Sequence, residues 1–466
     1  MQLHLFNSKQ FPIVCDLDNS LIRTDLVQEA SFALLWNRPH LALVAFFHLL
    51  CGNKVAAKNW LARHWTPNPA TLPYRERLVT YLKSQEGPVI LATASPQVWA
   101  DSIAQHLGCF TQVWGTVDTN LKGAEKLRKI RASYPKFIYI GDHHTADIPI
   151  WQASEGAILC DAPKSLSDKV SVPKINIDPS PSQFRLWITA LRPHHWTKNL
   201  IIGLAGVTGV GLYSWDRWYP ILYSIATFCF IVSGVYLIND IADLDADRVH
   251  VRKHVRPFAS GRLPLLTGVC VGVMCIGIGL TLASLVNVLF CFALLYLVMN
   301  LVYSMGLKKL VLIDIVFLAG FYLLRITLGA YIFGVPQSFW FYACLASLIL
   351  EFAFLKRFVE ISSSTQNPRR AYTSEDATLL QILGIGFAFM ATLILALYTQ
   401  STSIYKVYHH PQLLNSIIPL ILYHNLHFWF IAQRRQLHDD PLVAVAKSPL
   451  SWVIGVLIAG LLYFAR

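Results

Sequence analysis

Charged residues are scarce in this chain of 466 residues, and their scarcity argues against an ordinary soluble protein. Asp, Glu, Lys and Arg together make up 14% of the sequence, whereas hydrophobic residues make up 54%. Soluble domains usually contain about 25% charged residues. The composition therefore predicts a protein that lies at least partly in a membrane, and the length indicates more than one domain.

Cysteine pairs with the CxxC spacing are also lacking, and neither a signal peptide nor a nucleic-acid partner is expected. The nine cysteines include no CxxC pair and no metal-type spacing, which argues against a zinc site and a disulfide framework. No signal peptide precedes the first domain, so this domain is expected to stay on the side of the membrane where it is made. The net charge of +12 is attributed to cytoplasmic loops of a membrane protein, and nucleic acid is not expected as a partner.

Apolar residues are spread unevenly, and they divide the chain into two unlike parts. Residues 1–165 alternate short apolar runs with charged helical stretches, which predicts an α/β domain with a parallel sheet. A segment rich in Ser, Pro and Lys, 166–183, is expected to be a linker. Residues 184–466 contain about nine apolar runs long enough to cross a bilayer, which predicts an all-helical membrane domain. The runs lie near 198–213, 219–238, 264–284, 286–304, 310–333, 338–355, 378–398, 412–432 and 449–465.

Basic residues in the loops between these runs predict the orientation of the chain. The loops expected on one side are rich in Lys and Arg, whereas the opposite loops carry little beyond Arg217 and Lys406. The excess of positive charge marks the cytoplasmic side. We therefore expect an integral protein of the bacterial inner membrane, with the N-terminal domain and the active sites in the cytoplasm and the C-terminus outside.

One apolar stretch, residues 31–52, lies inside the N-terminal part and has a short break in its middle. We expect it to form helices of an inserted cap, at about residues 24–80, that rest on the membrane surface. Lys54, Lys58 and Arg63 would help by contacting lipid head groups. A tenth membrane span is the alternative.

The segment VCDLDNS places Asp16 and Asp18 at the end of an apolar strand, where alternation directs both carboxylates to the same side. Two acids at this spacing can divide the work at a phosphoryl group, because one attacks phosphorus or holds a cation while the other transfers a proton. Further polar residues follow in later segments of the same domain. They are Thr93, Ser95, Lys122, Lys126, Asp142 and Asp147.

In this order the motifs resemble those of the haloacid dehalogenase superfamily, over roughly residues 1–165. The resemblance implies a Rossmann-like phosphatase domain in which Asp16 is the nucleophile and Asp18 is the general acid and base. It implies that Thr93 binds the phosphoryl group, with Ser95 as the second candidate.

The same resemblance implies a lysine that neutralises the phosphoryl group and a bound Mg²⁺. Lys126 is the first candidate for the lysine, and the spacing leaves Lys122 open. A degenerate domain kept as a scaffold is the alternative, but no motif acid is missing. The implied Mg²⁺ site consists of Asp16, the backbone of Asp18, Asp142 and the supporting Asp147.

A second acidic cluster follows an apolar run in the membrane part. Asp240, Asp243 and Asp247 recur at i, i+3 and i+7, so a helix would bring them to one face, and Asn239 lies one step to the side. Three carboxylates this close repel one another unless a cation intervenes. Mg²⁺ that bridges to a diphosphate satisfies this requirement. Basic residues follow directly and are suited to contact phosphate oxygens.

This cluster, followed by RPFASG, resembles the UbiA superfamily of membrane prenyltransferases, over roughly residues 184–466. The resemblance implies a bundle of nine transmembrane helices around a central cavity. The aromatic prenyltransferases of that superfamily carry a second aspartate-rich motif, DxxxD. This chain instead contains KRFVE at 356–360.

That departure, with LRPHHWTKN at 191–199 and YSMGLKKLVLID at 303–314, makes the decaprenyl-phosphate phosphoribosyltransferase branch the closest resemblance. It implies transfer of phosphoribose from 5-phosphoribosyl diphosphate to a polyprenyl phosphate, with the acidic cluster holding Mg²⁺ and the leaving diphosphate. Asp314 and Arg325 are expected to pair with each other. The candidates for contacts with donor phosphates and the lipid head group are Lys198, Asn239, Lys253, Arg256, Tyr303, Lys308, Lys356, Arg357 and Glu360.

The two parts are expected to act in sequence, since a phosphatase is needed to remove the 5-phosphate that the transferase leaves on its product. Two alternatives stay open. One is transfer of a polyprenyl group from its diphosphate to an aromatic or other small acceptor. The other is a transporter or lipid carrier with a regulatory haloacid dehalogenase-like domain.

Overall fold

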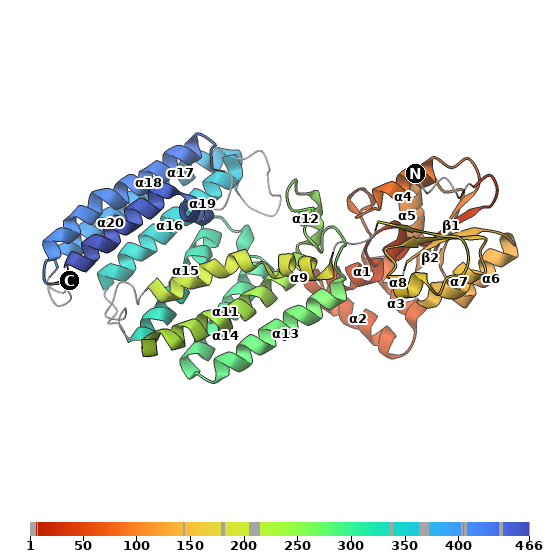
Figure 1. The fold of residues 1–466 in the computed structure, drawn as a ribbon, viewed down its shortest axis with the longest axis horizontal. Helices are drawn as coiled ribbons and strands as arrows, with labels where there is room; N and C mark the ends of the chain where they lie inside the picture. The colour runs from red at the N-terminus through yellow and green to blue at the C-terminus, as the bar shows by residue number, and fades with distance from the viewer. Residues whose placement is uncertain are drawn as a thin grey trace. The chain divides into compact units, whose positions relative to one another are not determined.

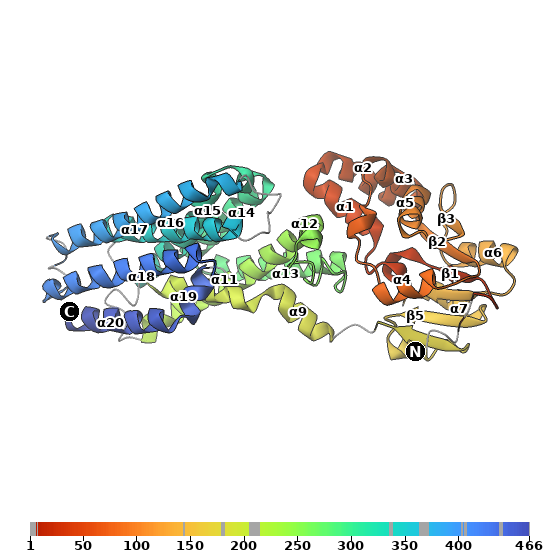
Figure 2. The same ribbon diagram turned by 90° about the horizontal axis from the view of Figure 1, so that it is seen from above.

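The structure is a computed structural model, and its helices and strands are shown from two directions in Figures 1 and 2. The chain forms two compact units. The first unit comprises Met1–Arg192 and Tyr236–Val273, and the second comprises Pro193–Val235 and Met274–Arg466. The residues that the structure describes are 6, 8–142, 145–178, 182–204, 215–334, 339–362, 372–401, 404, 408–437 and 441–465.

A parallel sheet of six strands forms the centre of the first unit within its described residues, in the order β3-β2-β1-β4-β5-β6. Successive residues of β1 point to opposite cores, because Ile13 and Cys15 belong to one buried cluster and Val14 to another. Strands that are buried on both faces read as continuous apolar runs. The predicted α/β domain with a parallel sheet is confirmed. The strands are β1 Ile13–Cys15, β2 Val89–Pro96, β3 Gln112–Thr116, β4 Ile138–Gly141, β5 Gly156–Cys160 and β6 Lys174–Ile177.

Residues 174–177, which the sequence assigns to the linker 166–183, instead form the edge strand of this sheet. They pair with β5 from Ala157 to Cys160, and they alternate between exposed and buried positions. Alternation is the pattern of a strand with one covered face. The strand is short and is surrounded by Ser, Pro and Lys residues, so the composition of the segment does not indicate a strand.

Helices cover both faces of the sheet and form the cap. The expected cap region contains α1, α2, α3, the short η3 and the start of α4. The side chain of Asp25 accepts a hydrogen bond from Gln28 N at 3.0 Å and so begins α1. The helices of the first unit are η2 Leu17–Leu21, α1 Leu26–Asn37, α2 Pro39–Leu50, α3 Lys54–His64, η3 Pro69–Thr71, α4 Glu76–Lys83, α5 Gln97–Leu107, α6 Ala124–Ser133, η4 Thr145–Asp147, α7 Ile148–Gln152, α8 Lys164–Ser167, α9 Gln183–Leu191 and α12 Leu244–Val249.

The second unit is helical, and two of its long helices, α11 and α13, continue into the first unit. α16, α17, α18 and α20 run side by side (Figures 1 and 2). Gly384 permits a close approach, because a Cβ there would lie 2.2 Å from the ring of Trp429. The helices are η5 Pro193–Gly203, α11 Trp215–Ala242, α13 Leu265–Ser284, α14 Asn287–Met305, η6 Leu307–Lys309, α15 Ile313–Phe333, α16 Phe339–Ser362, η7 Ser374–Asp376, α17 Ala377–Thr399, η9 Pro411–Ser416, α18 Ile417–Gln433, α19 Pro441–Lys447 and α20 Pro449–Ala465.

Six helices in the described part of the chain are long and apolar enough to cross a membrane: α11, α13, α14, α15, α16 and α17. The sequence predicts nine. The run 198–213 begins in the 3-10 helix η5, and its residues beyond 204 lie outside the described residues. The runs 412–432 and 449–465 contain α18 and α20, each 17 residues long and at the lower limit for a span. The chain is an integral membrane protein, and the count of nine stays a prediction.

Candidate functional site

The predicted phosphatase residues gather where neighbouring strands of the sheet end. Asp16 directly follows β1, Thr93 and Ser95 lie near the end of β2, and Asp142 directly follows β4. β1 lies between β2 and β4 in the sheet. Because parallel strands end at the same edge, these side chains meet in one crevice, where open α/β sheets bind their ligands.

A buried lysine neutralises the acid that follows β1. Lys126 Nζ lies 2.9 Å from Asp16 Oδ1, and Lys126 is only 2% exposed. Burial opposes its charge, but the Asp16 and Asp147 carboxylates outweigh burial and raise the pKa of Lys126. Lys122 is exposed. The fold therefore brings Lys126 to Asp16, where the spacing alone left both lysines open.

Asp18 lies among hydrogen-bond donors from β2 and from the cap. Its carboxylate accepts hydrogen bonds from Ser95 Oγ at 2.7 Å, from Thr93 Oγ1 at 3.3 Å and from Leu26 N at 3.0 Å. Burial, with repulsion from Asp25, raises the pKa of Asp18 to about 7. A carboxyl that titrates near neutral pH is suited to give and take a proton.

Asp147 is held by a tyrosine of β4. Tyr139 OH donates to Asp147 Oδ1 at 3.0 Å, and Lys126 Nζ lies 3.2 Å from the same hydroxyl. Asp147 Oδ2 is buried and has no hydrogen-bond partner among the described residues. Burial raises the pKa of Asp147 to about 7. The sequence did not single out Tyr139, because a tyrosine inside a buried strand is indistinguishable from a core residue.

The chemistry of this crevice fits Mg²⁺, which prefers carboxylate oxygens. Asp16, Asp142 and Asp147 supply such oxygens, and the buried Asp147 Oδ2 is an acceptor that a cation or its water would satisfy. Across the described ranges, no three His, Cys, Asp or Glu side chains converge closely enough to form a metal site by themselves. Backbone oxygen, water and phosphate ligands would therefore complete the coordination.

Lys58 of α3 points toward the end of β2, which corrects its expected place on the membrane surface. Its Nζ donates to Ala94 O at 2.5 Å and to Asn120 Oδ1 at 2.7 Å. Burial lowers the pKa of Lys58. The sequence gives the position of this lysine on the cap helix, but only the fold decides that this side of the helix faces the sheet.

The second acidic cluster lies at the end of α11 and in α12, and arginines pair with it. Arg192 Nη2 lies 2.6 and 2.7 Å from the two oxygens of Asp240. Arg256 Nη1 lies 2.5 Å from Asp247 Oδ2 and 3.3 Å from Asp240 Oδ1, so it bridges the two acids. Asp240 and Asp247 are both buried. Within the described part of the first unit, Asp240 thus contacts Arg192 and Arg256, and Arg256 also contacts Asp247.

The acidic segment is not one uninterrupted helix. α11 ends at Ala242, and Asp243 precedes α12, but Asp243 N still donates to Asn239 O and Asp247 N to Asp243 O, each at 2.9 Å. The helical rise therefore persists across the break, and Asp240 and Asp247 remain close enough to share Arg256. Asp243, Asn239 and Lys253 are half-buried.

In the second unit, Arg357 of α16 is buried and held from two directions. Its Nε donates to Asp314 Oδ2 at 2.5 Å, and its Nη1 donates to Glu360 Oε2 at 2.6 Å. Tyr372 OH donates to Asp314 Oδ1 at 2.6 Å. Arg357 Nη2 is buried without a hydrogen-bond partner among the described residues. The Nη2 group can therefore donate a hydrogen bond to a bound ligand.

The expected pair of Asp314 and Arg325 is wrong. Arg325 Nε donates to Asn199 Oδ1 at 2.9 Å, and its guanidinium lies 4.8 Å from the centre of the Tyr296 ring. Both residues of the expected pair belong to α15, where a separation of eleven residues corresponds to roughly 16 Å along the axis. That distance is too long for a direct ion pair, and Asp314 contacts Arg357 instead.

The remaining predicted residues of the second unit are half-buried and lie on separate elements. Tyr303 stacks on Phe317, with ring centres 6.0 Å apart. The positions are Lys198 in η5, Tyr303 in α14, Lys308 in η6 and Lys356 in α16.

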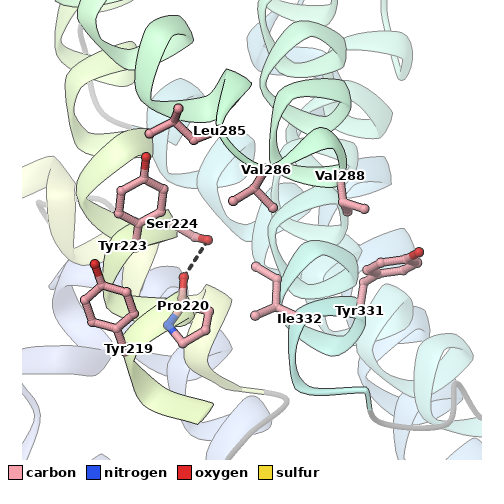
Figure 3. Close-up of a pocket in the computed structure, with 9 residues that line it drawn as sticks. All are labelled: Tyr219, Pro220, Tyr223, Ser224, Leu285, Val286, Val288, Tyr331 and Ile332. Carbon is pink, nitrogen blue, oxygen red and sulfur yellow. Dashed lines mark hydrogen bonds between the residues drawn. The ribbon is translucent and has the colours of Figure 1, made fainter. Parts of the chain in front are cut away.

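An apolar pocket of about 480 Å³ lies at other helix ends of the second unit (Figure 3). Ser224 Oγ within it donates to Pro220 O at 2.8 Å, so this hydroxyl is already engaged. The lining suits a hydrocarbon chain better than a phosphate group, and it includes no predicted site residue. The lining residues are Tyr219, Pro220, Tyr223, Ser224, Leu285, Val286, Val288, Tyr331 and Ile332.

Two protein families match the two parts of the chain. The model described as the UbiA prenyltransferase family matches residues 199–440, which is more than half of the chain. The chain belongs to the UbiA prenyltransferase family. A second model, described as haloacid dehalogenase-like hydrolase, matches residues 44–152. An N-terminal haloacid dehalogenase-like domain therefore accompanies the UbiA domain, as the motifs predict.

Individual relatives match different shares of this UbiA-family chain. The uncharacterized protein y4nM of Sinorhizobium fredii is 31% identical over 98% of this chain and 92% of its own length. A decaprenyl-phosphate phosphoribosyltransferase of Corynebacterium glutamicum is 34% identical over 37% of this chain and 54% of its own length, so the chain spans about half of that relative. The solved structure of a UbiA homolog from Archaeoglobus fulgidus bound to GPP and Mg²⁺ is 17% identical with a TM-score of 0.45, and it covers 60% of this chain and 98% of that chain.

Arg192, beside the UbiA acidic segment, is a second residue that the sequence did not single out. It lies in the quoted stretch LRPHHWTKN, directly before Pro193 and at the start of the membrane part. Its backbone φ is +53°, an uncommon value for a residue other than glycine. A charged residue at the start of the membrane part is a sign of a functional role. The sequence does not reveal its partner, because Asp240 lies 48 positions away.

Proposed function

We propose that the UbiA domain transfers 5-phosphoribose from 5-phosphoribosyl diphosphate to a polyprenyl phosphate and releases diphosphate. The observation that carries the proposal is the alternation of Asp240 and Asp247 with Arg192 and Arg256 at the end of α11. A diphosphate with its cations needs acidic and basic partners together. The relatives named decaprenyl-phosphate phosphoribosyltransferase support this donor and this acceptor.

The acidic segment would hold the leaving group. Asp240, Asp243 and Asp247, with Asn239, would coordinate Mg²⁺, which when bound supplies positive charge to the diphosphate. Arg256 would turn from the carboxylates to phosphate oxygens, where its planar fork is suited to bidentate contact. The bond between the anomeric carbon and the diphosphate oxygen breaks, and an oxygen of the lipid phosphate forms the new bond. Electrostatic stabilisation of the departing charge lowers the barrier.

Basic residues of the second unit would receive the phosphorylated lipid head group. Arg357 is the central candidate, because Asp314 and Glu360 fix its orientation while Nη2 still lacks a hydrogen-bond partner in the described residues. Fixed donors bind an anion with less loss of side-chain entropy than mobile ones do. The other residues proposed to contact substrate are Lys198, Lys253, Tyr303, Lys308 and Lys356.

We further propose that the haloacid dehalogenase-like domain removes the 5-phosphate from the lipid-linked product. Asp16 attacks phosphorus and forms an aspartyl-phosphate, while Asp18 donates a proton to the departing sugar oxygen. Asp18 then takes a proton from the water that hydrolyses the intermediate. Lys126 balances phosphoryl charge, and Thr93 and Ser95 donate hydrogen bonds. Mg²⁺ would be held by Asp16, the backbone of Asp18, and Asp142, with Asp147 in support.

The cap is proposed to lie on the cytoplasmic surface of a bacterial inner membrane. α2 leaves several large apolar side chains mostly exposed, among them Leu43, Phe47 and Leu50. Lys54 and Arg63 are exposed nearby in the sequence and suit anionic head groups. This placement would present lipid-borne phosphate to the crevice that contains Asp16.

One assay tests both activities. Purified full-length protein is incubated with 5-phosphoribosyl diphosphate, polyprenyl phosphate and Mg²⁺, and diphosphate and lipid products are followed. We expect diphosphate, a phosphoribosyl lipid and then its dephosphorylated form. Asp240→Asn should abolish diphosphate release, and Asp16→Asn should leave the phosphoribosyl lipid intact. Absence of any phosphoribosyl lipid from Asp16→Asn would overturn the transferase proposal, and a wild-type product that keeps its phosphate would overturn the phosphatase proposal.

Transfer of a polyprenyl group to an aromatic or other small acceptor is the second candidate, since the family name favours it. The same acidic segment would hold the same leaving group. The KRFVE stretch in place of a second DxxxD argues against this acceptor class. Release of diphosphate from a polyprenyl diphosphate, and not from 5-phosphoribosyl diphosphate, would favour this candidate.

A further inference from the structure

A buried ion pair inside the first unit connects the cap helix α1 with the acidic segment. Arg248 Nη1 lies 2.9 Å from Glu29 Oε2, and Arg248 Nη2 lies 2.5 Å from Glu29 Oε1. The two side chains are 4% and 2% exposed. This is the bidentate arrangement in which guanidinium and carboxylate groups interact most strongly.

The neighbours of the pair satisfy its remaining polar atoms. Thr24 Oγ1 donates to Glu29 Oε1 at 2.5 Å, and Arg248 Nε donates to Ala259 O at 3.2 Å. A buried ion pair does little for stability compared with apolar residues of the same size, whereas loss of one partner is costly. We therefore expect the pair to fix the position of α1 relative to the acidic segment, and to add little to the stability of the fold.

Each end of the pair lies next to one of the two proposed active sites. Glu29 is in the first turn of α1, and Leu26 N of the same turn donates to Asp18, the proposed general acid. Arg248 directly follows Asp247, whose carboxylate contacts Arg256. The ion pair of Glu29 with Arg248 therefore lies between Asp18 and the acidic segment that is proposed to bind diphosphate.

Further contacts hold the same face of the cap against the same segment. Gln28 Oε1 accepts a hydrogen bond from Leu266 N at 3.3 Å, and Phe32 packs against the buried cluster that contains Phe258. At Gly261, where φ is +68°, a Cβ would lie 2.6 Å from Arg23 O. The glycine of the RPFASG stretch thus permits the chain before α1 to approach closely.

We propose that Glu29 and Arg248 are positioning residues that dock the phosphatase cap onto the diphosphate segment, so that the phosphorylated product passes between the sites without leaving the protein. The inference rests on the proposed function, and it adds the partner surface and the residues that carry it. Breaking the pair should leave each reaction intact and impair only the transfer of product from one site to the other.

The test compares Glu29→Gln, Arg248→Gln and the exchanged pair Glu29→Arg with Arg248→Glu, all in the full-length protein. Glu125→Gln is the matched control, because Glu125 forms an exposed ion pair with Arg128 inside α6. Three quantities are measured: diphosphate release, hydrolysis of p-nitrophenyl phosphate, and the fraction of phosphoribosyl lipid that keeps its phosphate at equal turnover.

We expect the two single variants to keep diphosphate release and p-nitrophenyl phosphate hydrolysis within about twofold of wild type, while the phosphorylated fraction of the lipid product rises several-fold. The exchanged pair should lower that fraction again, because opposite charges still face each other. The control should match wild type.

Two results would contradict the inference. An unchanged phosphorylated fraction in both single variants overturns the inference. Loss of either separate activity in a single variant that still folds, without recovery in the exchanged pair, also overturns it, because the pair would then support the separate sites and not their docking. If a single variant fails to fold, Gln28→Ala tests the same docking surface through its bond to Leu266 N, and it should likewise raise the fraction. Failure of both wild type and Asp16→Asn to make a phosphoribosyl lipid or its dephosphorylated form overturns the proposed function instead.

Discussion

The two oxygens of the Asp147 carboxyl have different surroundings, and this difference links the proposed phosphatase site to pH. Oδ1 accepts a hydrogen bond from Tyr139, whereas Oδ2 is buried without one among the described residues. Burial raises the pKa from 3.8 to about 7. The protonated form therefore contributes stability that is complete below about pH 4 and is lost as the pH rises through about 7.

We expect local stability around β4 to fall from pH 5 to pH 8 when EDTA removes divalent cations, and Asp147→Asn should reduce this fall because Asn stays neutral. Hydrogen exchange of β4 peptides in the full-length protein measures the effect. Asp118→Asn, at an exposed position, is the control. An equal pH dependence in wild type and Asp147→Asn would contradict the assignment. Mg²⁺ should protect the wild type more at pH 8 than at pH 5.

Lys126 provides a second test at single-residue scale. Lys126→Met should lower p-nitrophenyl phosphate hydrolysis by about 100-fold or more, since loss of one preorganised charge at a reacting group has an effect of this size. Diphosphate release by the UbiA domain should not change. Lys122→Met is the matched control and should keep phosphatase activity near wild type. Equal losses in the two variants would show that the contact between Lys126 and Asp16 has no special role.

The end of α11 shows how an element brings distant charges together. Arg192, which follows α9, reaches Asp240 on α11, and the break at Asp243 still leaves Asp247 beside Arg256. We expect Arg192→Ala to lower diphosphate release by about 10-fold or more, because it leaves a buried carboxylate with one cationic partner fewer. Steady-state release of diphosphate measures this. Arg185→Ala, on the exposed side of α9, should have little effect, and an equal effect would assign the loss to α9 as a whole.

The exposed apolar side chains of α2 predict that this helix contacts the membrane. Phe46→Ser with Phe47→Ser should slow dephosphorylation of a phosphorylated lipid in vesicles several-fold, because the cap would lose apolar contact with the bilayer. Hydrolysis of soluble p-nitrophenyl phosphate should stay unchanged. Val98→Ser, which removes a similarly exposed apolar side chain from α5, is the control. Equal rates on vesicles for wild type and the double variant would contradict the membrane placement.

The sequence predicted the parts of both sites that depend on local order, and it missed the parts that depend on packing. Asp16 and Asp142 were predicted as site residues because acids that follow apolar strands meet at one edge of a parallel sheet. The choice between Lys122, which precedes α6, and Lys126, which lies on α6 and contacts Asp16, needed the packing of α6. The ion pair of Asp314 with Arg357 joins two helices. Contacts of this kind join residues far apart in the sequence, and one sequence carries no periodicity that reveals them.

At the scale of the whole molecule, the proposal requires two reactions in succession on one lipid-linked sugar. The first removes diphosphate from the donor, and the second removes the phosphate that the first leaves behind. If the chain passes its product directly from one site to the other, free phosphoribosyl lipid stays low while turnover proceeds. If the product diffuses, it accumulates until separate phosphatase sites capture it.

A mixture of two variants, each of which lacks one of the two activities, distinguishes these cases. Asp16→Asn chains keep the transferase site and Asp240→Asn chains keep the phosphatase site, so an equal mixture contains both activities on separate molecules. At equal numbers of working sites, we expect the mixture to accumulate several-fold more phosphoribosyl lipid than wild type, because the intermediate has to exchange between proteins. The lipid fraction that keeps its phosphate is followed with time in detergent. A mixture that matches wild type at every time point would show that the two sites work independently, although they share one chain.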